Sequence, residues 1–431
     1  MRDVPEFIVD IEKVAYGALG IARHEGQTIF VPGVIPGDRV LVSIESDKGR
    51  YAHAKVVEYV ERSPLTGESA CPYESCGGCQ WQHVSEKDQL SWKHSFVVDA
   101  FERIGKIELP EDFQVIPSPA KLNYRNRVLL RGTVHKDGTV GVGFFKKATK
   151  EQVHVRQCMI ARPVLNRVID QLPQLLVSIK PQKFRIELQE FEAFSTQEAC
   201  ISVVIHPVLK QDRSLESLAE KIRTFPEVIW AGLSCELKNP PFLALEESNE
   251  VTYFSAPGQF FQVNLAHNRL LRSFVTTQIT QGAQHKLRVL DLFCGSGNLS
   301  LELAASGHTI VGVEANAIAI KAANYAVSYN QLSHCTYKAG DATKFLSKCL
   351  NKSERFDVIV VDPPRAGMKE GMQALRGLAP KKIIYVSCDP NTLARDIAQI
   401  KHDYHVKTVS SFDFFPHTYH VETVAVLERK P

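Results

Sequence analysis

The C-terminal third of the chain alternates short apolar runs with helical segments, and this alternation limits the folds open to it. The stretch KLRVLDLFCGSG (286–297) is typical of a buried strand that enters a Gly-rich turn. A helix, NLSLELAASG, and a strand ending on an acid, HTIVGVEAN, come next, and FDVIVVDPPRAG, KKIIYVSCDPN and HVETVAVLERK supply three more strands. Strands that alternate with helices predict a parallel, doubly wound α/β sheet of the Rossmann-like type.

The Gly-rich turn and the acids after it indicate a bound ligand. Gly295 and Gly297 let the backbone approach a ligand closely and adopt positive φ. A dinucleotide fingerprint would need a third glycine where Ser300 stands, so a pyrophosphate is disfavoured. Glu314 ends the second strand, where it can accept hydrogen bonds from ribose hydroxyls, and Asp341 follows the third strand, near an adenine edge. The set fits S-adenosylmethionine; the alternative is a turn that only packs helix on strand.

Two later strand ends carry residues suited to chemistry. Asp362, in VVDPPRAG, stands at the carboxyl end of the fourth strand, where ligands of α/β proteins bind. Cys388, in YVSCDPNTLARD, stands at the end of the fifth strand. A cysteine is more often a plain buried residue, but its place in a loop with Asp389 favours a nucleophile. Glu422, at the start of the last apolar run, is the candidate base, and a solvated acid at a strand edge is the alternative.

A nucleophilic cysteine beside a methyl donor points to methylation of a pyrimidine at C5. C5 of uracil becomes carbanion-like once a thiolate has added to C6, and a base must then remove the C5 proton so that the thiolate can leave. A thiol of pKa about 8.5 is roughly 3% ionised at pH 7, and a pKa of about 7 would raise that share to about half. A lowered pKa at Cys388 would therefore favour the reaction.

A cluster of cysteines in the N-terminal half predicts a metal or iron–sulfur site. The stretch CPYESCGGCQWQH (71–83) places Cys71, Cys76 and Cys79 within nine residues. The N-terminus has acids where a signal peptide would have an apolar core, so a cytoplasmic location is expected. Cysteines are mostly reduced there, and clustered ones indicate metal binding or catalysis rather than disulfides. The usual occupants take four ligands, and a four-cysteine zinc site is the alternative to a cluster.

The rest of the chain divides into regions of different texture. Residues 6–60 alternate apolar and polar residues in short runs, which predicts a small all-β barrel or sandwich. Residues 85–107 have helical periodicity after an opening Ser85, and residues 120 to about 250 favour an α+β arrangement. Within it, 121–132 and 144–150 mix basic and aromatic residues. They are either solvated strand faces or a surface that follows RNA phosphates.

The length and charge of the chain limit its number of domains and the classes of function open to it. A chain of 431 residues exceeds one compact core, so two or three domains are expected. The net charge of +3, from 51 basic and 48 acidic residues, is too small to indicate nucleic acid by itself. No run of eighteen apolar residues occurs, so no transmembrane helix is expected.

Several of these stretches together resemble the RNA (uracil-5-)methyltransferase family. The resemblance covers nearly the whole chain, and it rests on FFQVN (260–264), DLFCGSGN, DPPRAG, SCDPNTLARD and FPHTYHVE (415–422). It implies three domains: a TRAM-type, RNA-binding β-barrel at 1–63; a central iron–sulfur domain at 64–84 plus 117–253; and an S-adenosylmethionine-dependent methyltransferase domain at 85–116 plus 254–431. It also implies that the helix at 85–107 packs on the methyltransferase domain.

The resemblance assigns roles residue by residue. Cys388 would be the nucleophile and Glu422 the base. Cys158, in VRQCMI, would complete a structural 4Fe-4S cluster with Cys71, Cys76 and Cys79. The residues implied to hold S-adenosylmethionine are Gln262, Phe293, Asn298, Glu314, Asp341 and Asp362.

The expected partner is RNA, with neither DNA nor a membrane, and the protein is expected to act as a monomer. The cluster and the barrel together favour 23S ribosomal RNA, with transfer RNA as the alternative. The target uridine must leave its stack to reach Cys388, which favours a loop or bulge. A cytosine-5-methyltransferase and a non-catalytic RNA-binding or assembly protein are the further alternatives.

Overall fold

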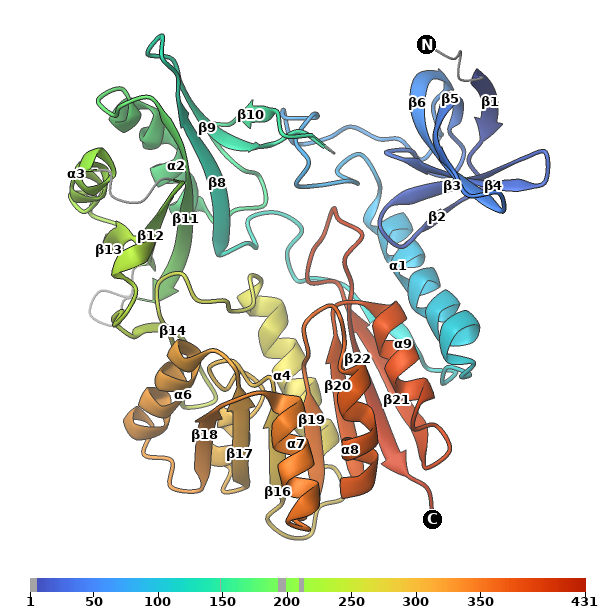
Figure 1. The fold of residues 1–431 in the computed structure, drawn as a ribbon, viewed down its shortest axis with the longest axis vertical. Coiled ribbons are helices and arrows are strands. Elements are labelled where there is room, and N and C mark those ends of the chain that lie inside the picture. Colours follow the sequence, from blue (N-terminus) through green and yellow to red (C-terminus); the bar gives the residue numbers. More distant parts are fainter. Residues whose placement is uncertain (1–5, 148, 193–198, 209–212) are drawn as a thin grey trace.

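In the computed structural model, the described residues are 6–147, 149–192, 199–208 and 213–431. Figure 1 shows the N-terminal strands and the central region side by side above the large C-terminal sheet. Among the described residues, no helix is both long and apolar enough to cross a membrane.

The first six strands form one curled sheet, drawn in blue in Figure 1. They are β1 (Glu6–Asp10), β2 (Lys13–Ala15), β3 (Leu19–His24), β4 (Gln27–Pro32), β5 (Arg39–Asp47) and β6 (Tyr51–Glu61), in the order β1-β5-β6-β4-β3-β2. Buried and exposed side chains alternate, as in β5, where Val40 and Val42 are buried and Arg39 is exposed. The alternation in the sequence therefore produced the predicted small β-barrel.

The central region is a second six-stranded sheet with two helices packed on it. The sheet has the order β10-β9-β8-β11-β12-β13. The strands are β8 (Arg127–Val134), β9 (Val140–Phe145), β10 (Gln152–His154), β11 (Gln182–Glu192), β12 (Ala199–Pro207) and β13 (Val228–Leu233). Helices α2 (Pro163–Leu176) and α3 (Arg213–Ile222) bury their apolar faces against these strands. A hairpin of β14 (Leu243–Ser248) and β15 (Val251–Ser255) then leads into the C-terminal part.

The C-terminal sheet has eight strands in the order β18-β17-β16-β19-β20-β22-β21-β7. They are β7 (Gln114–Ile116), β16 (Arg288–Leu292), β17 (Thr309–Glu314), β18 (Cys335–Ala339), β19 (Val358–Val361), β20 (Lys382–Ser387), β21 (Tyr404–Phe412) and β22 (Glu422–Arg429). The strands β16 to β20 are mutually parallel, as predicted, but β22 runs antiparallel to both β20 and β21. The expectation of a purely parallel sheet was therefore wrong at this edge, because a hairpin joins β21 to β22.

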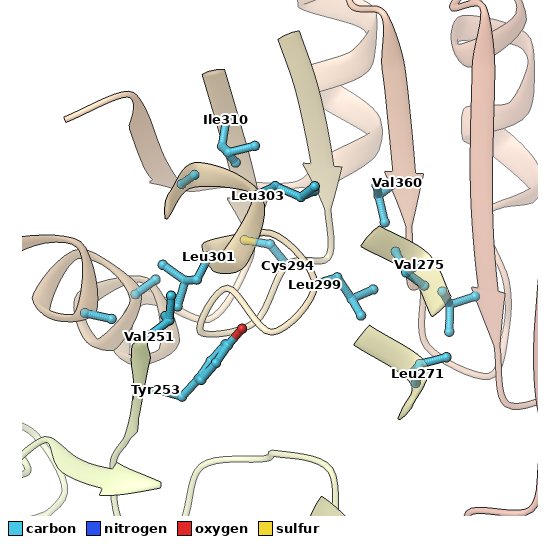
Figure 2. Close-up of a cluster of buried hydrophobic side chains, with 14 of the residues drawn as sticks. Val251, Tyr253, Leu271, Val275, Cys294, Leu299, Leu301, Leu303, Ile310 and Val360 are labelled. Atoms are coloured by element: carbon cyan, nitrogen blue, oxygen red, sulfur yellow. The ribbon is translucent and has the colours of Figure 1, made fainter. Parts of the chain in front are cut away.

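Helices cover both faces of this sheet. They are α4 (Leu265–Thr280), α5 (Leu301–Ala305), α6 (Ala317–Tyr329), α7 (Ala342–Asn351), α8 (Met372–Leu378) and α9 (Pro390–Ala398). One hydrophobic cluster joins α4, α5 and α6 to the sheet, and another joins α7, α8 and α9 to it. Figure 2 shows part of the first cluster, where Leu271 and Val275 of α4 lie near Leu299 and Cys294 of the Gly-rich turn. The turn is thus seated on a packed core.

One helix from the N-terminal half packs into the cluster that α7, α8 and α9 form with the sheet. Helix α1 (Glu86–Ala100) begins at the N-cap Ser85 and continues as a π-helical turn, Phe101–Gly105, within the predicted range 85–107. It packs against α9 and buries Val97 and Phe101 in the cluster of α7, α8 and α9. The side chain of Lys93 is fully buried, where it donates to the Asp413 carboxylate and to the Phe415 carbonyl. Helix α1 therefore holds the β21–β22 loop (413–421).

Candidate active site

The Gly-rich turn follows β16 with the backbone that the sequence predicted. Gly295 and Gly297 have φ of +53° and +90°, and Phe293 also has a positive φ, +61°. A Cβ at Gly297 would lie 2.9 Å from the Leu301 side chain and 3.0 Å from the Tyr337 hydroxyl, whereas a Cβ at Gly295 would meet nothing within 4 Å. Gly297 is therefore required for packing, and Gly295 leaves open space above the turn.

Three acids gather at the carboxyl ends of β16, β17 and β19. Asp291 is fully buried and accepts from the Ser300 hydroxyl, while its Oδ1 is buried without a hydrogen-bond partner among the described residues. Burial, and then repulsion from Glu314, raises the pKa of Asp291 to about 7. Burial, followed by repulsion from Asp291 and Glu314, raises the pKa of Asp362 to about 7 as well. Such crowded carboxylates suit a cationic ligand.

Three residues predicted to hold the cofactor already have hydrogen-bond partners within the protein. Glu314 accepts from the Gly295 amide at 3.3 Å, so it lies against the turn. Asn298 exchanges side-chain hydrogen bonds of 2.8 and 3.0 Å with Asn268. Asp341 caps α7 by accepting from the Lys344 amide at 2.8 Å.

Gln262 is half-buried in the segment before α4. Its carbonyl accepts from the side-chain amide of Asn126, at 3.3 Å. Asn126 precedes β8 of the central sheet, so this contact joins FFQVN to the central region.

Cys388 and Glu422 are brought together by the pairing of β20 with β22. Ser387, the last residue of β20, pairs with Thr423 in the antiparallel register, which places Cys388, the residue after β20, opposite Glu422. Cys388 is half-buried, and burial, followed by repulsion from Glu422, raises the pKa of its thiol to about 12. The pKa of this thiol is therefore shifted in the opposite direction to the lowering that would favour the reaction.

Glu422 is not a solvated strand-edge acid. Its side chain is only 3% exposed. Burial, followed by repulsion from Asp362, raises the pKa of this carboxyl well above its usual range, and Arg365 opposes the shift. A carboxylate held in this way is a strong proton acceptor once it is ionised.

Sequence reasoning missed Arg365, although it stands in DPPRAG directly after the predicted Asp362. Its charge lowers the pKa of the Cys388 thiol, and its guanidinium lies 3.3 Å from the His420 ring nitrogens. Burial, followed by the charge of Arg365, lowers the pKa of His420 to about 4, so this ring is neutral at pH 7. Asp389 caps α9, accepting from the Asn391 amide at 2.9 Å. The position of Arg365 could have identified it, because a cation close to a strand end rich in acids can influence the charges of the site.

The four candidate metal ligands line one cavity. Cys71, Cys76, Cys79 and Cys158 all border a cavity of about 1070 Å³ between the barrel and the central sheet. The Gly77 amide donates to the Phe145 carbonyl at 2.9 Å. This bond fixes the cysteine segment (71–83) on β9. In the described part of the chain, however, no three His, Cys, Asp or Glu side chains are already arranged to hold a metal ion.

A cleft beside this cavity contains several of the predicted basic and aromatic residues. It has a volume of about 480 Å³ and reaches from the barrel to the β21–β22 loop. Its lining includes Arg131, Phe144, Phe145, Lys146 and Lys147, whereas Ala148 of the predicted stretch 144–150 lies outside the described residues. Residues of both predicted stretches, 121–132 and 144–150, therefore line one cleft.

Comparison with known proteins identifies the family. Residues 85–430 match the family described as tRNA (Uracil-5-)-methyltransferase, and residues 6–57 match the TRAM domain. The chain belongs to this family. The recognition of an RNA uracil-5-methyltransferase with an N-terminal TRAM barrel, and the prediction of an enzyme, are thus confirmed.

Relatives match over nearly the full length of the chain. A protein of Shewanella sediminis named 23S rRNA (uracil(1939)-C(5))-methyltransferase RlmD is 32% identical, over 97% of this chain and 95% of its own. An uncharacterized RNA methyltransferase of Aquifex aeolicus is 31% identical over 100% of both chains. The solved structure of the Pyrococcus abyssi tRNA (uracil-54, C5)-methyltransferase, in complex with S-adenosyl-L-homocysteine, matches with a TM-score of 0.70 and 25% identity. It covers 97% of this chain and 100% of its own.

The raised pKa of Cys388 predicts its reactivity toward alkylation. With a pKa near 12, its reaction with iodoacetamide should rise about tenfold per pH unit from pH 7 to pH 10, because only the thiolate reacts. Arg365→Met should slow it by roughly 3- to 10-fold at pH 9, since a cation that favours the thiolate is lost. Mass spectrometry of the Cys388 peptide measures the rates, with the exposed Cys235 as internal reference.

Arg376→Met is the matched control, because Arg376 pairs with Asp403 on the surface. It should leave the Cys388 rate unchanged. A rate that levels off near pH 8, or equal slowing by both variants, would contradict the electrostatic account of this thiol.

Proposed function

We propose that this protein transfers a methyl group from S-adenosylmethionine to C5 of a uridine in RNA, with Cys388 as nucleophile and Glu422 as base. The observation that carries the proposal is the register of β20 and β22, which sets a thiol opposite a buried carboxyl at the carboxyl end of a Rossmann-like sheet. Covalent activation of uracil C5 needs such a pair. A non-catalytic binding protein would have no use for it.

The crowded acids support S-adenosylmethionine as the methyl donor. Its sulfonium and ammonium groups are cationic, and they would relieve the repulsion among Asp291, Glu314 and Asp362. The unpartnered Oδ1 of Asp291 and the open space above Gly295 are consistent with a ligand on this turn. The residues proposed to hold it are Gln262, Phe293, Asn298, Glu314, Asp341 and Asp362. Asn298 would have to exchange its contact with Asn268 for one with the ligand.

The proposed reaction uses these residues in sequence. The Cys388 thiol gives its proton to solvent, and Arg365 stabilises the thiolate as it adds to C6 of uracil. C5 then takes the methyl group from the sulfonium, which leaves as the neutral thioether. The Glu422 carboxylate removes the C5 proton, and the C–S bond breaks to restore the thiolate and the aromatic base. Its raised pKa makes Glu422 a stronger base for this last step.

An RNA with 5-fluorouridine at the target position tests both assignments. The wild-type protein should take up the methyl group and then stop, because fluorine at C5 cannot leave as a proton, so a covalent adduct should accumulate. Cys388→Ala should give neither adduct nor product. Glu422→Gln should methylate ordinary RNA but release product roughly 10²- to 10⁴-fold more slowly. Denaturing gel electrophoresis with a labelled methyl group measures each species.

The outcomes separate the two residues. Turnover by Cys388→Ala would refute the nucleophile. Fast release by Glu422→Gln would refute only the base. The search would then turn to Asp389 and His420: the Asp389 carboxylate is occupied as a helix cap, and burial and Arg365 make the neutral His420 ring a weak base.

We propose 23S ribosomal RNA as the substrate, with transfer RNA as the second candidate. Relatives named as 23S ribosomal RNA enzymes favour the first, and the solved neighbour from Pyrococcus abyssi, named as a transfer RNA enzyme, favours the second. Deleting the gene should remove one 5-methyluridine from 23S RNA, detected by mass spectrometry of RNase fragments. Loss from transfer RNA alone would select the second candidate, and a lost 5-methylcytidine would reject uridine as the target.

Other finer features are also proposals. Cys388 is only half-exposed, so the target uridine should be unstacked, in a loop or bulge. We also propose a monomer. The domain limits of 1–63, 64–84 plus 117–253, and 85–116 plus 254–431 are retained, because α1 packs on α9. A ribosomal RNA substrate would place the protein in the cytoplasm.

The cavity lined by four cysteines supports a 4Fe-4S cluster. Thiolates of Cys71, Cys76, Cys79 and Cys158 are the donor set that such a cluster takes, and the cysteine segment would have to shift to draw them together. The cluster would staple the cysteine segment to the segment that carries Cys158.

Anaerobically purified protein is expected to be brown and to contain about four irons per chain. Cys158→Ser should lower the iron content and the melting temperature, whereas Cys235→Ser, at an exposed cysteine outside the cavity, should change neither. Iron analysis and thermal unfolding measure the two effects. Stoichiometric zinc without iron in anaerobic material would reject the cluster in favour of a zinc site.

A further inference from the structure

A tyrosine of the N-terminal barrel contacts the backbone of the proposed nucleophile. Tyr16 lies in the three-residue turn between β2 and β3, and its hydroxyl donates to the Cys388 carbonyl at 2.9 Å. The two residues following Tyr16, Gly17 and Ala18, have φ of +96° and +57°. A left-handed alanine is uncommon and costs conformational energy, so the turn is held in this shape by its surroundings.

The ring of Tyr16 is fixed from two other parts of the chain. It packs edge-on against Phe96 of α1, with ring centroids 5.9 Å apart, and against Tyr419 of the β21–β22 loop, at 5.4 Å. Tyr419 in turn packs on His420 at 4.1 Å, and His420 contacts Arg365. Burial, then the charges of Asp389 and Cys388, raises the pKa of Tyr16 well above its usual range. Its hydroxyl therefore remains a donor at any physiological pH.

The peptide that joins Cys388 to Asp389 is held at both of its polar groups. Its N–H, the Asp389 amide, donates to the Ser387 hydroxyl at 3.1 Å, and that hydroxyl donates to the Asp389 carbonyl at 3.0 Å. Asp389 is also the N-cap residue of α9. The carbonyl of this peptide, that of Cys388, lies beyond the end of β20 and accepts from Tyr16, so the Tyr16 hydroxyl fixes the peptide plane next to the Cα from which the thiol projects.

We propose that Tyr16 is a positioning residue for Cys388, so that the RNA-binding barrel also completes the active site. The inference rests on the proposed function of Cys388. It means that the nucleophile is aligned only when the barrel is seated against α1 and the β21–β22 loop. The barrel is seated by a buried cluster that includes Val14, Ala18, Ile35, Trp81 and Phe96.

The test compares Tyr16→Phe with wild-type protein in the full chain. The substitution removes the hydroxyl and keeps the ring, so folding and the contacts with Phe96 and Tyr419 are retained. Single-turnover methyl transfer should slow by roughly 3- to 10-fold, the effect of one lost hydrogen bond. Dissociation constants for S-adenosylhomocysteine and for RNA should stay within about twofold. Alkylation of Cys388 by iodoacetamide should become faster, because a loosened loop exposes the thiol.

Tyr404→Phe is the matched control. The Tyr404 hydroxyl also donates to a backbone carbonyl, that of Pro380, at 2.8 Å, before the opposite end of β20. Tyr404→Phe should change neither the rate of methyl transfer nor the rate of Cys388 alkylation. Unchanged methyl transfer and alkylation in Tyr16→Phe would overturn the proposal, and so would slowing matched by an equal loss of RNA affinity. If wild-type protein methylates no RNA, the proposed function fails, but the alkylation comparison still decides whether Tyr16 positions Cys388.

Discussion

The candidate active site is organised around buried and half-buried carboxylates that lie close enough to repel one another. Asp291, Asp362 and Glu422 lie at the carboxyl ends of β16 and β19 and at the start of β22, and each has a raised pKa caused first by burial. A folded protein tolerates such crowding when a cation relieves it. Arg365 supplies a charge on the side of Cys388, and a sulfonium donor would supply one on the side of the Gly-rich turn. The same crowding raises the pKa of Cys388, although Arg365 opposes the shift, and in the proposed reaction the bound donor would be a further cation that favours the thiolate.

The N-terminal half of the chain builds the support for this site. The buried Lys93 of α1 anchors the β21–β22 loop through Asp413. The His417 carbonyl accepts from the amides of Gln80 and Trp81, both at 2.9 Å, directly after Cys79. The cysteine segment, α1 and the barrel therefore meet on the loop that leads into Glu422. The proposed cluster, by stiffening the cysteine segment, would also stiffen the loop that leads into the proposed base, so a structural cofactor would have a catalytic consequence.

Much of the fold and part of the site could be predicted from the sequence, because they depend on local patterns. The parallel strands and the Gly-rich turn are encoded by apolar runs and by residues that tolerate positive φ. The positions of Asp362 and Cys388 at strand ends followed from the same pattern. The reversed direction of β22 and the edge strand β7 did not, since a short apolar run has no inherent direction. Asn298 was assigned to the ligand, but its amide pairs with Asn268, a partner that local pattern could not reveal.

By itself, the sequence determined the chemistry available to this protein: a thiol, a carboxyl and a ligand turn, each at the end of a strand. The tertiary structure decided how these groups affect one another. Burial and repulsion raise the pKa of Cys388, and no local pattern reports the charges that surround a side chain after folding. The structure also brought Tyr16 to Cys388 across 372 residues of chain. Contacts of that range depend on how whole domains pack, and packing is fixed by shape and burial over many residues at once.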